Sequence, residues 1–456
     1  MGYLVKHIIF LLAVISLSAC SDNLQTADDG NPDGSVSASV AKYEFGDKST
    51  RVELSQGENG VEFRWSEGDV IAVVGYKQDA YGEKDFQMTN HTLSSFSSDR
   101  LWANFDGGAF TLSPSATYFS FYPYNSTVTT VSSNQCQRYI SFTGQKQTGN
   151  NSLAHLGAYN YMVANEVTTD ESGSCAFQFQ NSCCPVRFTL LMPDDAQGKV
   201  VTSLTVTRYQ NADHKFVTKA LQKMENISSS ITYQESTIDV SQTLNFEECT
   251  LDSDHQLVAW EMFFPKDHTT GATLPARYYI TVSCGDGSVY AASSAGKNMV
   301  GGKAYRINAT MADHVVIDAK AWKIRNEGAT LPYDLGTIYN DYSDATESIK
   351  SQLPTVDEAT ALINTQNNEF LLGSGYDSNG TLQYGLYIRA KSSDNSATPI
   401  FLPATYNDGG NHVGRYWLQG GEKYLYFDAN TLSACINSIE GNTSISAAAR
   451  LITTAE

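Results

Sequence analysis

The chain has 456 residues with 49 acidic and 30 basic side chains, and its formal net charge is −19. This balance disfavours nucleic acid and anionic membrane surfaces as partners, because phosphate binding needs clustered Lys and Arg. The length predicts two to four domains, and the abundance of aromatic residues, 26 Tyr and 20 Phe, is typical of an extracellular β-rich protein.

The N-terminus has the features of a secretory signal. Lys6 and His7 precede an apolar run over residues 8–15, which is too short to span a membrane. The sequence Leu17-Ser18-Ala19-Cys20 resembles a bacterial lipobox, which implies cleavage before Cys20 and a lipid on its thiol. We therefore expect a signal peptide over residues 1–19 and an outer-membrane lipoprotein held by acyl chains. The alternative is a secreted protein with a chance cysteine at its cleavage site.

Residues 20–42 are expected to form a disordered tether, because they are rich in Asp, Ser, Asn and Gly and have little to bury. Ordered structure is predicted to begin near Tyr43. Alternating apolar and charged residues indicate a half-buried strand over residues 61–65. Further strands are predicted over residues 70–74, 118–122, 177–179, 186–191, 204–206, 260–264, 278–282 and 305–309. Short strands separated by turn signals favour β-sandwiches.

The pattern changes in the last third of the chain. Residues 343–351 and 355–364 have helical spacing, and Thr355 with Glu358 fits a capping box. Short aromatic strands then return. This order predicts a separate α+β domain with its own core, in which we expect Trp417 to be buried.

Seven cysteines follow Cys20, and an odd number cannot pair completely within one chain. No C-x-x-C pair occurs, so neither a zinc site nor a redox site is predicted. The sequence leaves open whether one or two disulfides form. Adjacent Cys183 and Cys184 are expected to point to opposite faces of a strand.

The chain has no recognisable catalytic pattern. Its eight histidines lack a metal-ligand spacing such as H-x-x-x-H, and G-x-S-x-G, P-loop and dinucleotide fingerprints do not occur. Acid pairs such as Asp194-Asp195 would suit a glycosidase, but they are common in an acidic protein. Residues 377–380 and Asn407-Asp408 offer oxygen ligands for calcium, although turn chemistry explains them better. We expect no enzyme activity, no cofactor and no metal.

Residues 50–54, 65–71, 118–124, 145–147, 159–164, 177–190 and 301–307 carry a resemblance, in this order and spacing, to the fimbrillin-type proteins of Bacteroidales, the subunits of type V pili. The resemblance implies two tandem β-sandwich domains of the transthyretin-like fimbrillin kind. It also implies that a protease cuts after a basic residue, and that another subunit's extended segment fills the resulting groove by donor-strand exchange. Arg51 is the best candidate for the cut, with Lys42 and Lys48 as alternatives. The other interpretation of Arg51 is an ordinary exposed strand residue.

Residues 353–358, 399–404 and 414–417, followed by 449–452, resemble the Fibrobacter major paralogous domain, which has a C-type-lectin-like fold. Two departures stand out: Ser351-Gln352 replaces the usual Trp-Arg, and Cys435 alone remains where such domains carry paired cysteines. Sugar binding does not follow from the fold.

These features predict a mainly β protein. After the tether, a β-sandwich is expected over residues 43–180, a second over residues 181–313, and an α+β, C-type-lectin-like domain over residues 314–456. The expected function is that of an adhesive pilus subunit on the cell surface. Because a bulky domain follows the second sandwich, the subunit is expected to accept a strand without donating one, which puts it at the pilus tip. The alternatives are a pilus anchor and a surface lipoprotein that never polymerises.

Exposed loop residues of the C-terminal domain are the candidates for ligand contact, with a glycan or a protein of a host or bacterial surface as the expected ligand. They are Tyr406, Asn407, Asp408, Asn411 and His412. The alternative is that these residues form plain solvated turns.

Overall fold

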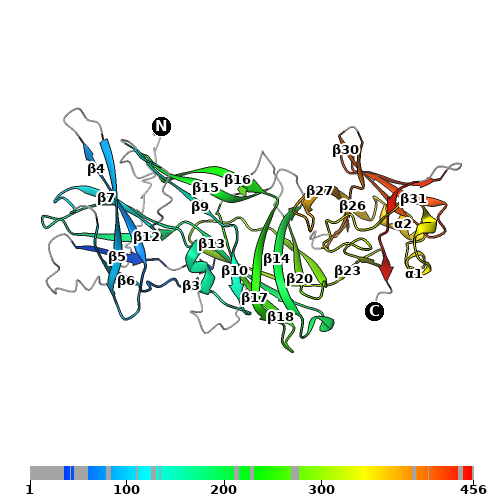
Figure 1. Cartoon of the computed structure of the whole chain (residues 1–456), viewed down its shortest axis with the longest axis horizontal. Coiled ribbons are helices and arrows are strands. Elements are labelled where there is room, and N and C mark those ends of the chain that lie inside the picture. Colours follow the sequence, from blue (N-terminus) through cyan, green and yellow to red (C-terminus); the bar gives the residue numbers. More distant parts are fainter. Residues whose placement is uncertain are drawn as a thin grey trace, which may run out of the picture.

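The computed structural model describes residues 35–41, 43–45, 60–78, 84–108, 111–124, 130–132, 135–209, 215–225, 231–265, 267–268, 277–392, 397–408, 410–439 and 445–453. Three units lie in a row along the longest axis (Figure 1). Nearly all of the regular structure is strand, so the predicted mainly β class is confirmed. No helix of the described part is long and apolar enough to cross a membrane.

Seven strands of the first unit close into a barrel in the order β1-β12-β11-β7-β4-β5-β6. The sheet is thus joined edge to edge around a core that contains Trp65, Phe105 and Phe177. The strands are β1 (Val36–Val40), β4 (Val70–Gln78), β5 (Lys84–Phe96), β6 (Trp102–Asp106), β7 (Thr117–Tyr122), β11 (Met162–Thr168) and β12 (Cys175–Asn181).

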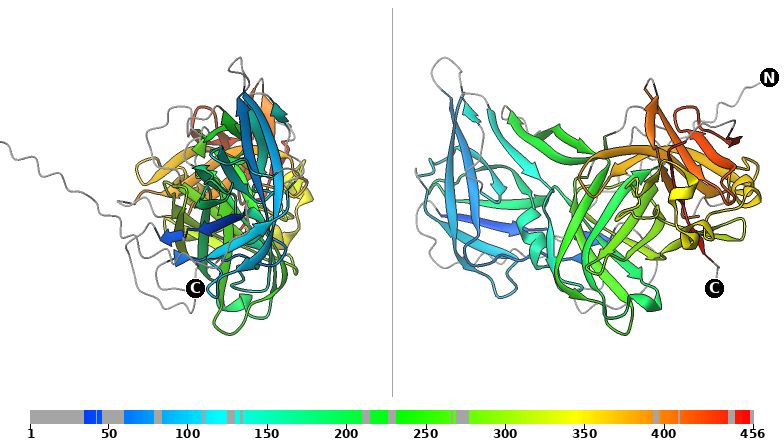
Figure 2. Two further views of the ribbon diagram at one scale, coloured as in Figure 1. Left: turned by 90° about the vertical axis from the view of Figure 1, so that its left-hand side faces the viewer. Right: turned by 45° about the vertical axis from the view of Figure 1, so that its right-hand side comes forward.

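Strand β1 corrects one part of the predicted disordered tether over residues 20–42, because residues 36–40 form a strand. Across β1, Val, Ala and Val alternate with two serines, which is the period of a half-buried strand. The polar composition of the surrounding residues conceals this short pattern. Figure 2 shows β1, in dark blue, among the strands of the first unit.

The second unit is a β-sandwich. Its facing sheets have the orders β10-β17-β14-β20-β21 and β18-β13-β22-β2-β3, and a third sheet has the order β16-β15-β9-β8, with β19 paired to β15. Phe188, Leu204 and Ile280 lie in the core. The strands are β2 (Tyr43–Phe45), β3 (Gly60–Val61), β8 (Thr130–Ser132), β9 (Gln135–Ser141), β10 (Lys146–Thr148), β13 (Cys184–Leu191), β14 (Val200–Tyr209), β15 (Lys215–Glu225), β16 (Ile231–Asp239), β17 (Ser241–Thr250), β18 (Gln256–Phe263), β19 (Asp267–His268), β20 (Arg277–Cys284), β21 (Val289–Ala295) and β22 (Lys303–Thr310).

The first two units share the N-terminal part of the chain. Strands β2, β3, β8, β9 and β10 all precede residue 181, yet they belong to sheets of the second unit. The predicted domain over residues 43–180 is therefore not one unit in space. A strand's partners are set by pairing between distant segments, which local patterns do not reveal.

The strand predicted over residues 61–65 is wrong beyond its first residue, since β3 ends at Val61. The reason is that Val61 and Trp65 are both buried but lie in different cores. The chain leaves the second unit after Val61 and enters the first unit at Trp65. The alternating apolar residues of this stretch are therefore explained by burial in two different cores, and the chain between them need not form a strand.

The third unit contains short helices and three small sheets, as an α+β region. Helix α2 (Val356–Leu362) has the predicted capping box between Thr355 and Glu358, with Ala359 buried. The other helices are α1 (Glu347–Lys350) and the 3₁₀ turn η3 (Tyr342–Asp344), while 3₁₀ turns η1 (Ala154–Tyr159) and η2 (Asp194–Ala196) lie earlier in the chain. The strands are β23 (His314–Ile317), β24 (Lys320–Lys323), β25 (Ile338–Tyr339), β26 (Asn368–Tyr376), β27 (Leu382–Ala390), β28 (Ile400–Pro403), β29 (Tyr406–Asp408), β30 (Asn411–Trp417), β31 (Lys423–Asp428), β32 (Ser433–Ser438), β33 (Ala447–Ala448) and β34 (Ile452–Thr453).

The core of the third unit is only partly separate, as one cluster around Trp417 belongs to this unit alone and another is shared with the second unit. Tyr209 and Tyr279 of the second unit lie in one apolar cluster with Tyr387 and Phe401 of the third. The ring centroids of Tyr209 and Tyr387 are 5.0 Å apart. An aromatic contact of this kind joins the two units through their interiors.

The seven cysteines of the described chain form no disulfide. Cys183 and Cys184 lie in different apolar clusters, but Cys183 precedes strand β13, so the two are not neighbours on one strand as predicted. Burial raises the pKa of the Cys183 thiol to about 12, so it behaves as a small apolar residue.

Candidate functional site: the groove filled by the N-terminal segment

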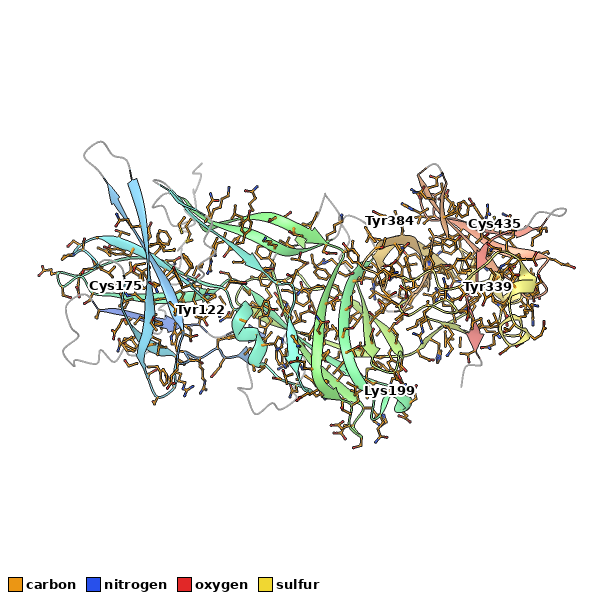
Figure 3. The ribbon with its side chains drawn as sticks, viewed as in Figure 1. Tyr122, Cys175, Lys199, Tyr339, Tyr384 and Cys435 are labelled. Carbon is orange, nitrogen blue, oxygen red and sulfur yellow. The ribbon has the colours of Figure 1, made fainter. Side chains whose placement is uncertain are left out.

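Strand β1 occupies a place between two strands that come much later in the sequence. It runs parallel to β12, with Val36 opposite Cys175, and antiparallel to β6, with Val36 opposite Phe105. Both of its backbone edges are therefore paired. Beyond the strand's start, Ser35 accepts a bond from the Cys175 N–H at 3.0 Å. Cys175 is labelled in Figure 3 at the start of β12.

The buried face of β1 completes the core of the barrel. Val36 and Ala38 are buried, and Val40 packs partly against the same cluster. Their neighbours include Trp65, whose ring meets Phe105 edge to face at 5.0 Å. Without β1, the barrel would be open along one side of this aromatic core.

Strand β2 carries the same segment into the second unit. It pairs in parallel with β22. The hydroxyl of Tyr43 donates to Oδ1 of Asn160 at 2.7 Å, and its ring lies 5.3 Å from that of Phe63. Between the two strands, Nδ2 of Asn181 donates to the Ala41 carbonyl at 2.8 Å. Strands β1 and β2 thus pair within sheets of two successive units, and we call the positions that they occupy the groove.

A cavity of about 240 Å³ lies beside this segment at the junction of the two units. Val40, Trp65, Tyr122 and Met162 are among its lining residues. The hydroxyl of Tyr122 donates to Oδ1 of Asp69 at 2.8 Å. Burial raises the pKa of Asp69, and the hydrogen bonds it accepts counter part of that rise.

Four of the five predicted ligand residues can be placed with their side chains, and all five share one hairpin. Asn407 faces His412 across β29 and β30, and Asp408 faces Asn411. Oδ1 of Asn407 accepts the Gly410 N–H at 2.9 Å, which is turn chemistry.

Sequence reasoning missed two partners of this hairpin. The His412 ring stacks on Tyr384 of β27 at 4.1 Å, and Tyr384, labelled in Figure 3, is 37% exposed. Nη2 of Arg415 donates to the Tyr406 hydroxyl at 2.7 Å. No local signal links Tyr384 to His412, because they meet only through the fold.

The predicted turn at residues 377–380 is also explained by backbone chemistry. Oδ1 of Asp377 accepts the N–H groups of Asn379 and Thr381 at 2.9 and 2.8 Å. Within the described ranges, no group of three or more His, Cys, Asp and Glu side chains is placed to hold a metal ion.

A second, larger cavity of about 490 Å³ lies where the second and third units meet. Its charged lining includes Asp195, Asp313, Lys323 and Arg325. Nζ of Lys323 donates to Asp313 at 2.6 Å, so part of this charge is already paired. The predicted lipidation site Cys20 and the cut sites Lys42, Lys48 and Arg51 lie outside the described residues.

No protein-family model matches the chain. No curated protein matches it either. Among solved structures, a proposed cell adhesion protein from Bacteroides ovatus is 14% identical over 60% of this chain and 91% of its own, with a TM-score of 0.39. A proposed cell adhesion protein from Bacteroides uniformis is 14% identical over 61% and 93%, with a TM-score of 0.36. The tip fimbrial protein Mfa3 from Porphyromonas gingivalis, with a C-terminal truncation, is 10% identical over 57% and 81%, with a TM-score of 0.24. These values are too low for the neighbours' functions to be transferred to this chain.

Proposed function

We propose that this protein is an adhesive pilus subunit that assembles by donor-strand exchange after its N-terminal segment is cut away. One observation carries the proposal: β1 and β2 fill interior positions of two units, yet both precede Arg51 in the chain. A cut at Arg51 would separate both strands from the rest of the protein. The resemblance of residues 50–54 and 65–71 to fimbrillins points to the same cut.

The physical consequence of the cut favours polymerisation. Loss of β1 leaves unpaired N–H and C=O groups on both β12 and β6, together with an exposed aromatic core. Unpaired strand edges bind extended chains readily, and an incoming strand satisfies both the backbone and the apolar face. Another pilus subunit is the proposed donor.

Delivery to the surface is proposed to depend on Cys20. Its lipid would hold the precursor at the outer membrane, as the lipobox resemblance implies. The residues between Cys20 and β1 would then act as a spacer. A subunit cut at Arg51 would leave this lipid behind, whereas an anchor would keep it.

The third unit is proposed to be the adhesive part, with a C-type-lectin-like fold and a glycan or surface protein as ligand. The hairpin of β29 and β30 is its proposed contact region. Strand β34 is paired with β24 within the unit, so it is not free to enter a neighbour's groove. A subunit that accepts a strand without donating one ends the pilus, which is the reason for proposing the tip.

N-terminal sequencing of the protein from assembled surface fibres tests the proposal. We expect the mature chain to begin after Arg51. A chain that begins at lipidated Cys20 within fibres would indicate an anchor, and absence from any fibre would indicate a non-polymerising binder. Immunogold labelling of the third unit tests the position, since gold along the shafts would mean a stalk subunit.

A further inference from the structure

We propose that the groove filled by residues 36–45 selects its partner through three side-chain sites. The partner segment is inferred to carry a small residue at the Ala38 position, a bulky apolar residue at the Val40 position and a tyrosine at the Tyr43 position. This inference rests on the proposed function, because it names the segment that strand exchange would bring.

The first site admits only a small side chain. Ala38 is 0% exposed and points into the barrel core. Its cross-strand neighbours are Ala103 on β6 and Phe177 on β12, both buried. A close-packed interior does not accept extra methylene groups without strain. A leucine in this place would have to displace Phe177 or the strand itself.

The second site is larger than the residue that now occupies it. Val40 is only partly buried and lines the cavity of about 240 Å³ together with Trp65 and Met162. A bulkier apolar side chain would bury more surface than valine does. A partner strand with such a residue would therefore bind more tightly than the chain's own segment.

The third site requires both a ring and a hydroxyl. Tyr43 is 0% exposed and lies in the core of the second unit. Its hydroxyl bonds to Asn160 at 2.7 Å, and its ring packs on Phe63. Loss of the hydroxyl would leave the Asn160 oxygen without this donor in a buried place. The site fixes the register, because it follows the Val40 position by three residues.

The distance between the sites sets the length of the partner segment. Ten residues from Val36 to Phe45 span about 33 Å when extended. The segment must also run parallel to β12 and then parallel to β22, as β1 and β2 do. A shorter segment would reach only one of the two units.

The first experiment uses the intact chain, where the sites act on the chain's own segment. Ala38→Leu should lower the melting temperature by about 4 to 10 °C. The matched control is Ser39→Leu, at the neighbouring residue, whose side chain is partly exposed. This variant should shift the melting temperature by less than about 2 °C. Val40→Phe should raise the melting temperature by about 2 to 4 °C. Equal effects of Ala38→Leu and Ser39→Leu would overturn the first site.

The second experiment leaves the receptor unchanged. In the full-length protein, a recognition sequence for a site-specific protease replaces the residues around Arg51, and the protein is cut there and freed of the released segment. Fluorescent peptides of residues 36–45 are then titrated. Relative to the chain's own sequence, Val40→Phe should bind about fivefold more tightly. Ala38→Leu should bind at least about tenfold more weakly, and Tyr43→Phe about fivefold more weakly.

The outcomes separate the inference from the proposed function. Failure of the chain's own peptide to bind the folded, cut protein would overturn both. Binding of that peptide with no discrimination against Ala38→Leu would overturn the inference alone and leave donor-strand exchange standing. The control peptide carries Ser39→Leu, and its dissociation constant should lie within about twofold of that of the original sequence.

Discussion

The backbone N–H of Trp260 donates a hydrogen bond of 2.8 Å to Oε1 of Gln147. Nε2 of the same Gln147 amide donates to the Val258 carbonyl at 3.0 Å. The side chain thus donates to and accepts from strand β18, as the backbone of a neighbouring strand would. Gln145 makes the same double contact with Met262 at 2.7 Å in each direction. Strand β18 is the last of its sheet, and these amides cover its free edge.

Gln147→Ala should therefore destabilise the protein by about 1 to 3 kcal/mol. The substitution leaves the N–H of Trp260 buried without its partner, whereas the Val258 carbonyl keeps a bond from the Asn151 N–H at 2.9 Å. Lys146→Ala, which removes only an exposed ion pair with Glu247, is the matched control and should cost less than about 1 kcal/mol. Urea unfolding followed by fluorescence measures both. Equal midpoints for the two variants would contradict the edge-covering role.

Trp417→Ala should cost about 3 to 5 kcal/mol, because the side chain is buried in the third unit. Its ring meets Tyr342 at 5.8 Å, and its Nε1 donates to the Tyr339 carbonyl at 3.4 Å. Val316→Ala, at a residue that is 51% exposed, should change the free energy of unfolding by less than about 0.5 kcal/mol. Thermal unfolding of both variants checks this, and a small loss for Trp417→Ala would place the ring outside the core.

Tyr209 and Tyr387 should be energetically coupled across the junction of the second and third units. A double-mutant cycle with alanine is expected to give a coupling of about 0.5 to 1.5 kcal/mol, as for a buried aromatic pair. The control cycle pairs Tyr209 with Trp417, which lies in another cluster, and should give additivity within about 0.5 kcal/mol. Additive effects in the first cycle would show that this ring contact contributes no coupling between the two units.

Glu261 should make stability fall as the pH rises. It is fully buried, and burial raises its pKa to about 8, although Gln242 opposes part of that rise. An unfolded glutamate titrates near about 4.3. Between these values the folded state holds a proton that the unfolded state has released, so the free energy of unfolding decreases from about pH 4.3 to about pH 8.

Glu261→Gln carries no titrating proton and should remove this dependence. We expect the variant to exceed the original protein by about 2 to 4 kcal/mol at pH 9 and to be close to it at pH 4. The control is Glu422→Gln, at an exposed residue, and this variant should have the same free energy of unfolding as the original protein at pH 4 and at pH 9. Urea unfolding across the pH range gives the comparison. Parallel curves for Glu261→Gln and the original protein would rule out the buried acid as the cause.

Cys20→Ala should abolish lipid labelling and surface delivery. The expectation follows from the lipobox resemblance, in which the thiol carries the lipid. Incorporation of radioactive palmitate in cells that express each form measures it. Unchanged labelling of the variant would mean that the protein is not a lipoprotein of this kind.

Local patterns in the sequence were enough for some of the individual elements. The strands at Val70 and Tyr118 and helix α2 follow from side-chain period and from the capping pair Thr355 and Glu358. Each of these depends on residues only a few positions apart. Tyr406 and His412 were predicted as exposed loop residues, and only the structure shows that they belong to the paired strands β29 and β30.

The sequence by itself therefore determined the mainly β class, several of the strands and the cap of helix α2, because period and capping act between near neighbours. Only the tertiary structure decided that β1 enters the barrel beside Cys175, that Tyr209 packs on Tyr387, and that Gln147 covers the edge at Trp260. These contacts join segments more than 100 residues apart. Which distant segments pair depends on the packing and closure of the whole chain, and no short pattern encodes it.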